Sequence, residues 1–297
     1  MPDDKYAGWG MEGQGKAMRE LSADLVQKTV ADLTVRAAID LPCDVEAALV
    51  AAQQTETSAL GRSALETLVK NAHIARDMRL PLCQDSGVMV VFVDWGEEVI
   101  ISGGSIESAI TQGIADATKT GYLRAGIVAD PLRRVNTENN TPPVIHTRLV
   151  PGDAVTITVA PKGFGSENMT VLEFLLPHTS QDEIIDKIVA AVARAGSNPC
   201  PPVVIGVGLG GVAETCCLAA KRALLREIGS RHADKLYAEL ETRTLTAVNA
   251  LNIGPQGFGG STTALAVHIE PLPTHIAGLP LCVNICCHAL RHKTDIL

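Results

Sequence analysis

The 297-residue chain is poor in aromatic side chains: four Phe, three Tyr and two Trp, or 3% of the sequence. Its core must therefore be built mainly from Ala, Val, Leu and Ile. No uninterrupted apolar run approaches the ~18 residues of a membrane span, so no transmembrane helix is predicted. The sequence has no run of Lys or Arg, and its net charge is −8, from 33 acidic and 25 basic residues. These features argue against a nucleic-acid partner.

The N-terminus also lacks the basic start and apolar core of a secretory signal, so we expect a cytoplasmic protein. Residues 1–14 are Gly-rich and are expected to be flexible, whereas residues 15–297 are expected to form a single catalytic domain. In a reducing compartment the eight cysteines are not expected to form disulfides. They are instead buried apolar residues, reactive thiols or metal ligands.

Apolar periodicity predicts both helices and strands. Helices are expected over 16–41, 44–73 with a break near Gly61, 106–118, 181–196, 211–228 and 233–250. Strands are expected over 88–93, 99–102, 144–150, 154–160, 203–207 and 263–269. Helices and strands do not strictly alternate, which argues against a doubly wound sheet. We therefore expect an α+β fold, one compact domain of mixed sheets with packed helices.

Several polar loops interrupt these elements. Residues 121–143 form a long polar loop that includes Arg124, and residues 162–168 form a Gly-rich one. Long loops inside compact domains tend to be functional. The arginines could bind carboxylates in bidentate fashion or simply be solvated.

A second Gly-rich segment, Gly206-Val-Gly-Leu-Gly-Gly211, matches the G-x-G-x-x-G pattern between a predicted strand and a predicted helix. Formally this is a dinucleotide-binding fingerprint. However, two successive helices follow it rather than a series of βαβ units. Close packing of glycines between strand and helix is the favoured interpretation, with a nucleotide site as the alternative.

The cysteines differ in context. Cys216 and Cys217 lie within an Ala/Leu-rich helix and are predicted to be core residues, whereas Cys83, Cys200 and Cys287 lie in or beside Pro-rich or polar loops. Their separations of 117 and 87 residues fit no zinc-ribbon or C-x-x-C pattern. Spacing alone leaves a three-thiolate site and simple packing both open.

Six blocks together resemble those of one enzyme family. Cys83-Gln-Asp-Ser-Gly87 resembles the C-Q-D-[ST]-G signature of the class I, iron–sulfur-dependent fumarases and the related tartrate dehydratases. The other blocks follow in the family's order: 121–142, 162–168, Cys200-Pro-Pro with 252–257, Pro273-Thr-His275, and Cys287-His-Ala-Leu-Arg-His292. The resemblance covers nearly the whole chain and implies the fold of the class I fumarase N-terminal domain.

The resemblance also implies a [4Fe–4S] cluster held by three thiolates. Its ligands would be Cys83, Cys200 and Cys287. Cys286 is an alternative third ligand, because the residue before that ligand is not usually Cys and because the block that usually reads C-A-A-T-R-H here reads Cys-His-Ala-Leu-Arg-His. The fourth iron would stay open to act as a Lewis acid on the substrate hydroxyl. Phe164 stands where the family more often has glycine, and is expected to narrow the substrate pocket.

Substrate contacts are implied at a small set of positions: Gln84, Asp85, Arg124, Gly165 and His275. Asp85 would assist proton transfer or position the substrate, and His275 would hydrogen-bond a substrate carboxylate. From the residues alone, Asp85 could equally cap a turn, and a lone histidine such as His275 is more often structural.

The implied reaction is the reversible hydration of fumarate to (S)-malate, a step of the tricarboxylic acid cycle. The alternatives are dehydration of L-tartrate, hydration of mesaconate, or a cluster-free scaffold role. Single-chain members of the family continue into a C-terminal domain that this chain, ending at Leu297, lacks. The resemblance therefore implies an alpha subunit whose site a beta subunit completes, in a heterotetramer with an alpha dimer at its centre. The isolated chain is expected to be inactive.

Overall fold

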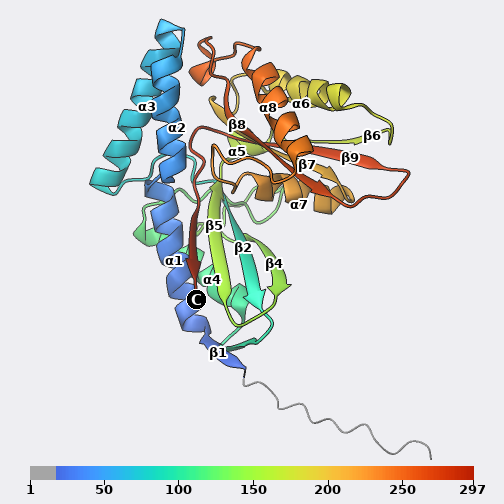
Figure 1. Ribbon diagram of the computed structural model, residues 1–297. Helices are drawn as coiled ribbons and strands as arrows, with labels where there is room; N and C mark the ends of the chain where they lie inside the picture. The colour runs from blue at the N-terminus through green and yellow to red at the C-terminus, as the bar shows by residue number, and fades with distance from the viewer. Residues whose placement is uncertain (1–17) are drawn as a thin grey trace, which may run out of the picture.

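Two four-stranded mixed sheets organise residues 18–297, the part of the chain that the computed structural model describes (Figure 1). The expected flexible segment 1–14 lies outside the described residues. The helices are α1 (Ala23–Ile39), α2 (Cys43–Thr55), α3 (Ala59–Met78), α4 (Ile106–Thr120), α5 (Phe164–Glu167), α6 (Gln181–Ala195), α7 (Ala213–Ala223), α8 (Lys235–Asn249) and the 3₁₀ turn η1 (Pro255–Gly257). The strands are β1 (Arg19–Ser22), β2 (Val88–Gly96), β3 (Val99–Ser102), β4 (Val144–Val150), β5 (Val155–Lys162), β6 (Val171–Leu175), β7 (Val203–Gly210), β8 (Ala264–Leu272), β9 (Leu279–Cys286) and β10 (Lys293–Ile296). The expected α+β architecture with mixed sheets is confirmed.

The N-terminal helix prediction was wrong at its start. Arg19–Ser22 form β1, which pairs in parallel with β3, and α1 begins only at Ala23. Ser22 ends the strand and caps the helix, because its side-chain oxygen accepts a hydrogen bond from Leu25 N at 3.2 Å.

The break predicted near Gly61 was also misplaced. The chain leaves α2 after Thr55 and re-enters a helix at Ala59. Ser58 is the N-cap of α3 and accepts from the backbone N–H of Gly61, so Gly61 lies in the first turn rather than in the break. The cap, and not the glycine, sets the boundary.

The first sheet has the strand order β10-β5-β2-β4. β2 pairs antiparallel with β5 and parallel with β4, while β10 pairs antiparallel with β5. Helices α1 and α4 pack together beside this sheet (Figure 1). Their shared core is aliphatic, as the scarcity of aromatics requires, and includes Val26, Val30, Leu33, Val91, Ile110, Ile114, Ile157 and Val159.

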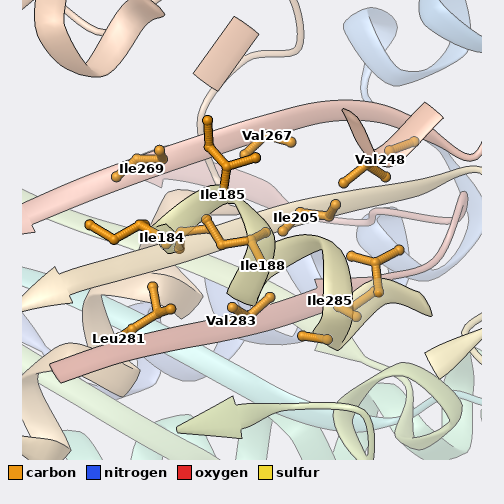
Figure 2. Packing of buried hydrophobic residues seen from close by; sticks show 14 of the residues in the cluster. Ile184, Ile185, Ile188, Ile205, Val248, Val267, Ile269, Leu281, Val283 and Ile285 are labelled. Atoms are coloured by element: carbon orange, nitrogen blue, oxygen red, sulfur yellow. The ribbon is translucent and has the colours of Figure 1, made fainter. Parts of the chain in front are cut away.

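The second sheet has the order β6-β9-β7-β8, with β7 and β8 parallel and the other pairs antiparallel. Helix α6 begins with the predicted capping box, in which Ser180 and Glu183 exchange side-chain-to-backbone hydrogen bonds. Figure 2 shows three isoleucines of α6, at positions 184, 185 and 188, packed over strand residues that include Ile205 and Val283. Val248 of α8 extends the same core.

Glycines let α7 approach the opposite face of this sheet. A Cβ on Gly206 would lie 2.1 Å from Ala220 O, and one on Gly208 would lie 2.0 Å from Cys216 O. No side chain fits there, so the glycines of the G-x-G-x-x-G segment serve strand–helix packing. Cys216 packs against Cys282 in this layer and is buried, as predicted for the core.

A third apolar cluster joins α2 and α3 to the second sheet. It contains Leu82, just before Cys83, and it also contains Cys286, Ala289 and Leu290 around Cys287. Leu82 is further held by hydrogen bonds to Ala38 O and from the Asn71 side chain. The packing of this cluster therefore fixes two distant cysteine loops relative to each other. None of the helices in residues 18–297 is long and apolar enough to cross a membrane.

Candidate active site

Three cysteine loops meet between the elements just described. Cys83 lies between α3 and β2, Cys200 lies between α6 and β7, and Cys287 directly follows β9. Burial, followed by the nearby thiols of Cys287 and Cys83, raises the pKa of the Cys200 thiol. Cys200 thus lies within electrostatic reach of both other predicted ligands, although 117 and 87 residues separate it from Cys83 and Cys287 along the chain.

The Cys200 loop has an unusual backbone. Cys200 adopts φ +55°, the left-handed region, and is followed by a cis Pro201–Pro202 peptide bond. A non-Gly residue held in the left-handed region, as Cys200 is, is found disproportionately at functional sites. The loop is secured by Gln256, whose side-chain Nε2 donates to Pro201 O at 2.8 Å.

The segment that follows Cys287 contacts both other loops. His288 Nδ1 lies 3.0 Å from Cys200 O, and Arg291 Nη2 donates to Asp85 O at 2.8 Å. Asp85 N in turn donates to Cys83 Sγ at 3.4 Å. Hence one short segment, 287–291, ties together the Cys83 and Cys200 loops, whose cysteines lie 117 residues apart in sequence.

Cys286 and Cys287 have different environments. Cys286 is buried in the third apolar cluster, opposite Val204 on β7, whereas Cys287 is partly exposed and acts electrostatically on Cys200. A hydrogen bond from Cys287, together with the charges of Lys162 and Arg291, lowers the pKa of Cys286 to about 6. Position favours Cys287 over Cys286 as a partner of the other two thiols.

The three thiols do not form a site for a single ion. Within residues 18–297, no three His, Cys, Asp or Glu side chains surround a point that could hold one metal ion. An iron–sulfur cluster instead accepts each thiolate at a different iron, so its ligands surround a volume. Three thiols in adjoining loops are compatible with a cluster of that kind.

The carboxylate of Asp85 joins two neighbouring loops. Its Oδ1 accepts from Gly87 N at 2.9 Å, and its Oδ2 accepts from Phe164 N at 2.9 Å. Both oxygens keep lone pairs for further contacts, because an ionised carboxylate has about four acceptor sites. Asp85 therefore caps a turn and can still act on a bound molecule.

Beside Asp85 lies a cavity of about 370 Å³. It is lined by Gln84, Asp85, Ser86, Gly87, Arg124, Gly126, Ile127 and Phe164. Ser86 Oγ accepts from Arg124 N at 2.9 Å, which sets the start of the long polar loop at the cavity wall. The Arg124 side chain forms no ion pair with any described residue, so it is available for an anionic ligand. Phe164, 48% exposed, forms part of the wall, where it was expected to narrow the pocket.

The remaining two predicted contacts are placed differently. Gly165 follows Phe164 in α5, and a Cβ there would lie 3.4 Å from Asn198 O in the Cys200 loop. Gly165 thus adjoins the Cys200 loop and directly follows a residue of the cavity wall. His275 lies on the exposed loop between β8 and β9, where its Nδ1 accepts from Ala277 N, and it is not among the residues that line the cavity. Its role in substrate binding stays a prediction.

Behind the site lies an ionic network that the sequence did not single out. The segment predicted as a Gly-rich loop, 162–168, in fact contains the end of β5 and the short helix α5. Lys162, 4% exposed, donates to Ser166 Oγ and Ile285 O and lies 3.2 Å from Glu167 Oε2. Glu167 also accepts from Lys221 and Asn284. In the sequence, the only sign of this network was that Lys162 and Glu167 both lie within the matched block 162–168.

This network predicts acid sensitivity. Burial alone would raise the pKa of Glu167, but the charge of Lys162 and the hydrogen bonds from Lys221 and Asn284 lower it to about 2. A depressed folded-state pKa adds stability that is complete above the unfolded value of 4.5 and is lost as the pH falls toward 2. Glu167→Gln should cost about 3 kcal/mol at pH 7 and almost nothing at pH 2. Urea unfolding between pH 2 and 7 measures the difference.

Glu173→Gln is the matched control, because its partner Lys187 is exposed and such pairs contribute at most about 1 kcal/mol. A Glu167→Gln penalty that stays constant across the pH range would show that the ionic network does not stabilise the fold.

Comparison with known proteins identifies a family and several relatives of the same printed function. The family model described as Fumarate hydratase (Fumerase) matches residues 27–295. A protein of Methanocaldococcus jannaschii named "Putative L(+)-tartrate dehydratase subunit alpha" is 39% identical over 272 residues, which cover 90% of this chain and 95% of the relative. The L(+)-tartrate dehydratase subunit alpha of Escherichia coli (strain K12) is 31% identical over 280 residues, covering 93% and 92%. The protein of the same name from Shigella sonnei matches equally well.

Proposed function

The chain belongs to the Fumarate hydratase (Fumerase) family of hydro-lyases, and from this premise we propose that it is the alpha subunit of an iron–sulfur L(+)-tartrate dehydratase. The observation that carries the proposal is the meeting of three cysteine loops beside a cavity lined by Asp85 and Arg124. The sequence blocks alone favoured fumarate as the substrate, whereas the names of the relatives favour tartrate.

The proposed cofactor is a [4Fe–4S] cluster bound by Cys83, Cys200 and Cys287. When bound, it would supply a Lewis acid for the hydroxyl that leaves the substrate. The closeness of the Cys200 thiol to those of Cys83 and Cys287 supports this assignment.

The chain's own residues would supply the remaining chemistry. Dehydration of tartrate removes a hydrogen from one carbinol carbon and a hydroxyl from the other, giving water and an enol that tautomerises to a 2-oxo dicarboxylate. Asp85 is the proposed base, since it is held by two backbone N–H groups and lines the cavity. Arg124 would pair with one substrate carboxylate, and Gln84 would donate a hydrogen bond.

A beta subunit is the proposed partner, within a cytoplasmic heterotetramer that has an alpha dimer at its centre. The loop 121–143, which contributes Arg124 to the cavity, also exposes Tyr122 to 85% and Leu132 to 90%. Exposed aromatic and aliphatic side chains beside a site fit a surface that a partner covers. The chain alone should accordingly be inactive.

The test is an anaerobic purification of the tagged chain from its native cells, with whatever subunit accompanies it, followed by assays on L-tartrate, (S)-malate, fumarate and mesaconate. We expect kcat/KM for L-tartrate to exceed that for (S)-malate by more than about 10²-fold, because a site that hydrogen-bonds an additional hydroxyl discriminates strongly against its absence. Preference for malate and fumarate would make the protein a fumarate hydratase. An iron-free preparation with no turnover would leave the scaffold alternative.

A further inference from the structure

The buried guanidinium of Arg291 is only partly satisfied by the protein. Arg291 is 2% exposed, and its Nη2 donates to Asp85 O at 2.8 Å. Its Nε and Nη1 have no hydrogen-bond partner among residues 18–297. Nor does any Asp or Glu of the described chain form an ion pair with it. Such a group is strongly unfavourable in a folded protein unless an anion meets it.

The surroundings of Arg291 show where that anion would lie. Arg291 follows Cys287 by four residues and holds the peptide of Asp85, two residues after Cys83. Lys162, equally buried, adds a second positive charge, but its Nζ is engaged by Ser166, Ile285 and Glu167. Of the two cations, only Arg291 keeps unpartnered N–H groups.

We propose that Arg291 is the internal counter-ion of the thiolate-bound cluster, and that it couples the cluster's charge to the position of the Asp85 loop. This inference rests on the proposed function. It makes Arg291 a positioning residue: Nη2 orients the loop that carries Cys83 and Asp85, while Nε and Nη1 are available to donate to thiolate or sulfide sulfur. Hydrogen bonds of this kind to sulfur tune both retention and potential of iron–sulfur clusters.

A counter-ion role and a purely structural role of Arg291 predict different effects of substitution on the cluster-free and the cluster-loaded protein. If Arg291 only holds the Asp85 peptide, Arg291→Gln destabilises the empty and the loaded protein alike. If it is the counter-ion, the same substitution removes an uncompensated charge from the empty protein and a needed charge from the loaded one. Arg291→Lys keeps the charge and loses the forked geometry.

The experiment compares wild type, Arg291→Gln and Arg291→Lys, with Arg148→Gln as control because Arg148 forms an exposed pair with Asp94. Each protein is prepared anaerobically, both empty and reconstituted with iron and sulfide. Thermal melting of the empty form, loss of iron to a chelator, and the reduction potential of the loaded form are measured. For Arg291→Gln we expect an unchanged or higher melting temperature when empty, about 10-fold to 100-fold weaker retention of iron, and a lower potential. Arg291→Lys should lie between Arg291→Gln and wild type.

Equal iron retention and potential in wild type and Arg291→Gln would overturn the proposal while leaving the proposed function intact. Failure of both variants to fold would also overturn it, since the residue would then be structural. A wild type that holds no iron would refute the proposed function itself, and with it this inference.

Discussion

Replacing Cys83 by Ala should yield a folded, colourless chain that retains no iron, and its complex with the proposed beta subunit should lose more than about 10³-fold in hydro-lyase activity. The proposed cluster would supply several kcal/mol of stabilisation to the leaving hydroxyl, and we expect two thiolates to be too few to retain the cluster. Cys83 is partly exposed in a loop, so removing its thiol should disturb little packing. Absorbance near 400 nm, iron and sulfide content, and turnover after anaerobic reconstitution give the result.

The chain offers close controls for this prediction. Cys200→Ala and Cys287→Ala should behave like Cys83→Ala, whereas Cys286→Ala should keep its colour, because Cys286 is buried in the apolar cluster beside Val204. Cys43→Ala, at an exposed helix start, should match wild type. A colourless Cys286→Ala beside a brown Cys287→Ala would move the third ligand to Cys286.

In the complex with the proposed beta subunit, substituting Asp85 by Asn should reduce kcat by about 10²-fold to 10⁴-fold while the iron content stays near that of wild type. The amide cannot accept the substrate proton. It also has one oxygen for the two N–H groups of Gly87 and Phe164, so one donor loses its acceptor at a cost of about 1–3 kcal/mol. Steady-state kinetics, iron content and melting temperature separate the two effects.

Asp130→Asn is the matched control. Asp130 also caps a loop, but a single oxygen, Oδ1, accepts from both Leu132 N and Arg133 N, and an amide oxygen can do the same. Asp130 does not line the cavity. If Asp85→Asn kept its kcat within about twofold of wild type with a full cluster, the base would have to be another residue.

Local patterns were enough for elements whose signals lie in their own residues. The apolar run Val88–Val93 and the Ser180 capping box identify β2 and the start of α6 in the correct places. β6 was not predicted, since its five residues include Glu173 and its strand character depends on pairing with β9. The first strand was missed for a related reason: four residues that pair with β3 carry no pattern distinct from the helix that follows.

The site shows a similar division. No spacing rule connects Cys83, Cys200 and Cys287, so their grouping came from the family resemblance, and only the folded chain shows why they meet. The two readings of Asp85, turn cap and reactive group, prove compatible because its oxygens have lone pairs beyond the two backbone contacts. Arg291 could not be singled out from sequence. The role proposed for it depends on a hydrogen bond to a residue 206 positions away and on side-chain nitrogens that have no hydrogen-bond partner.

The wide separation of the three cysteine loops also bears on the lifetime of the protein. A cluster bound at all three would act as a covalent cross-link that closes loops of 117 and 87 residues. In the chain-entropy view of cross-links, each loop of that size destabilises the unfolded state by about 4–5 kcal/mol. Oxidative destruction of the cluster would remove this constraint at the same moment as it removes activity. Copies that have lost the cluster would then unfold more often than intact copies and would be degraded faster by proteases. Degradation would thereby remove inactive copies preferentially, with no dedicated protein needed to detect the damage.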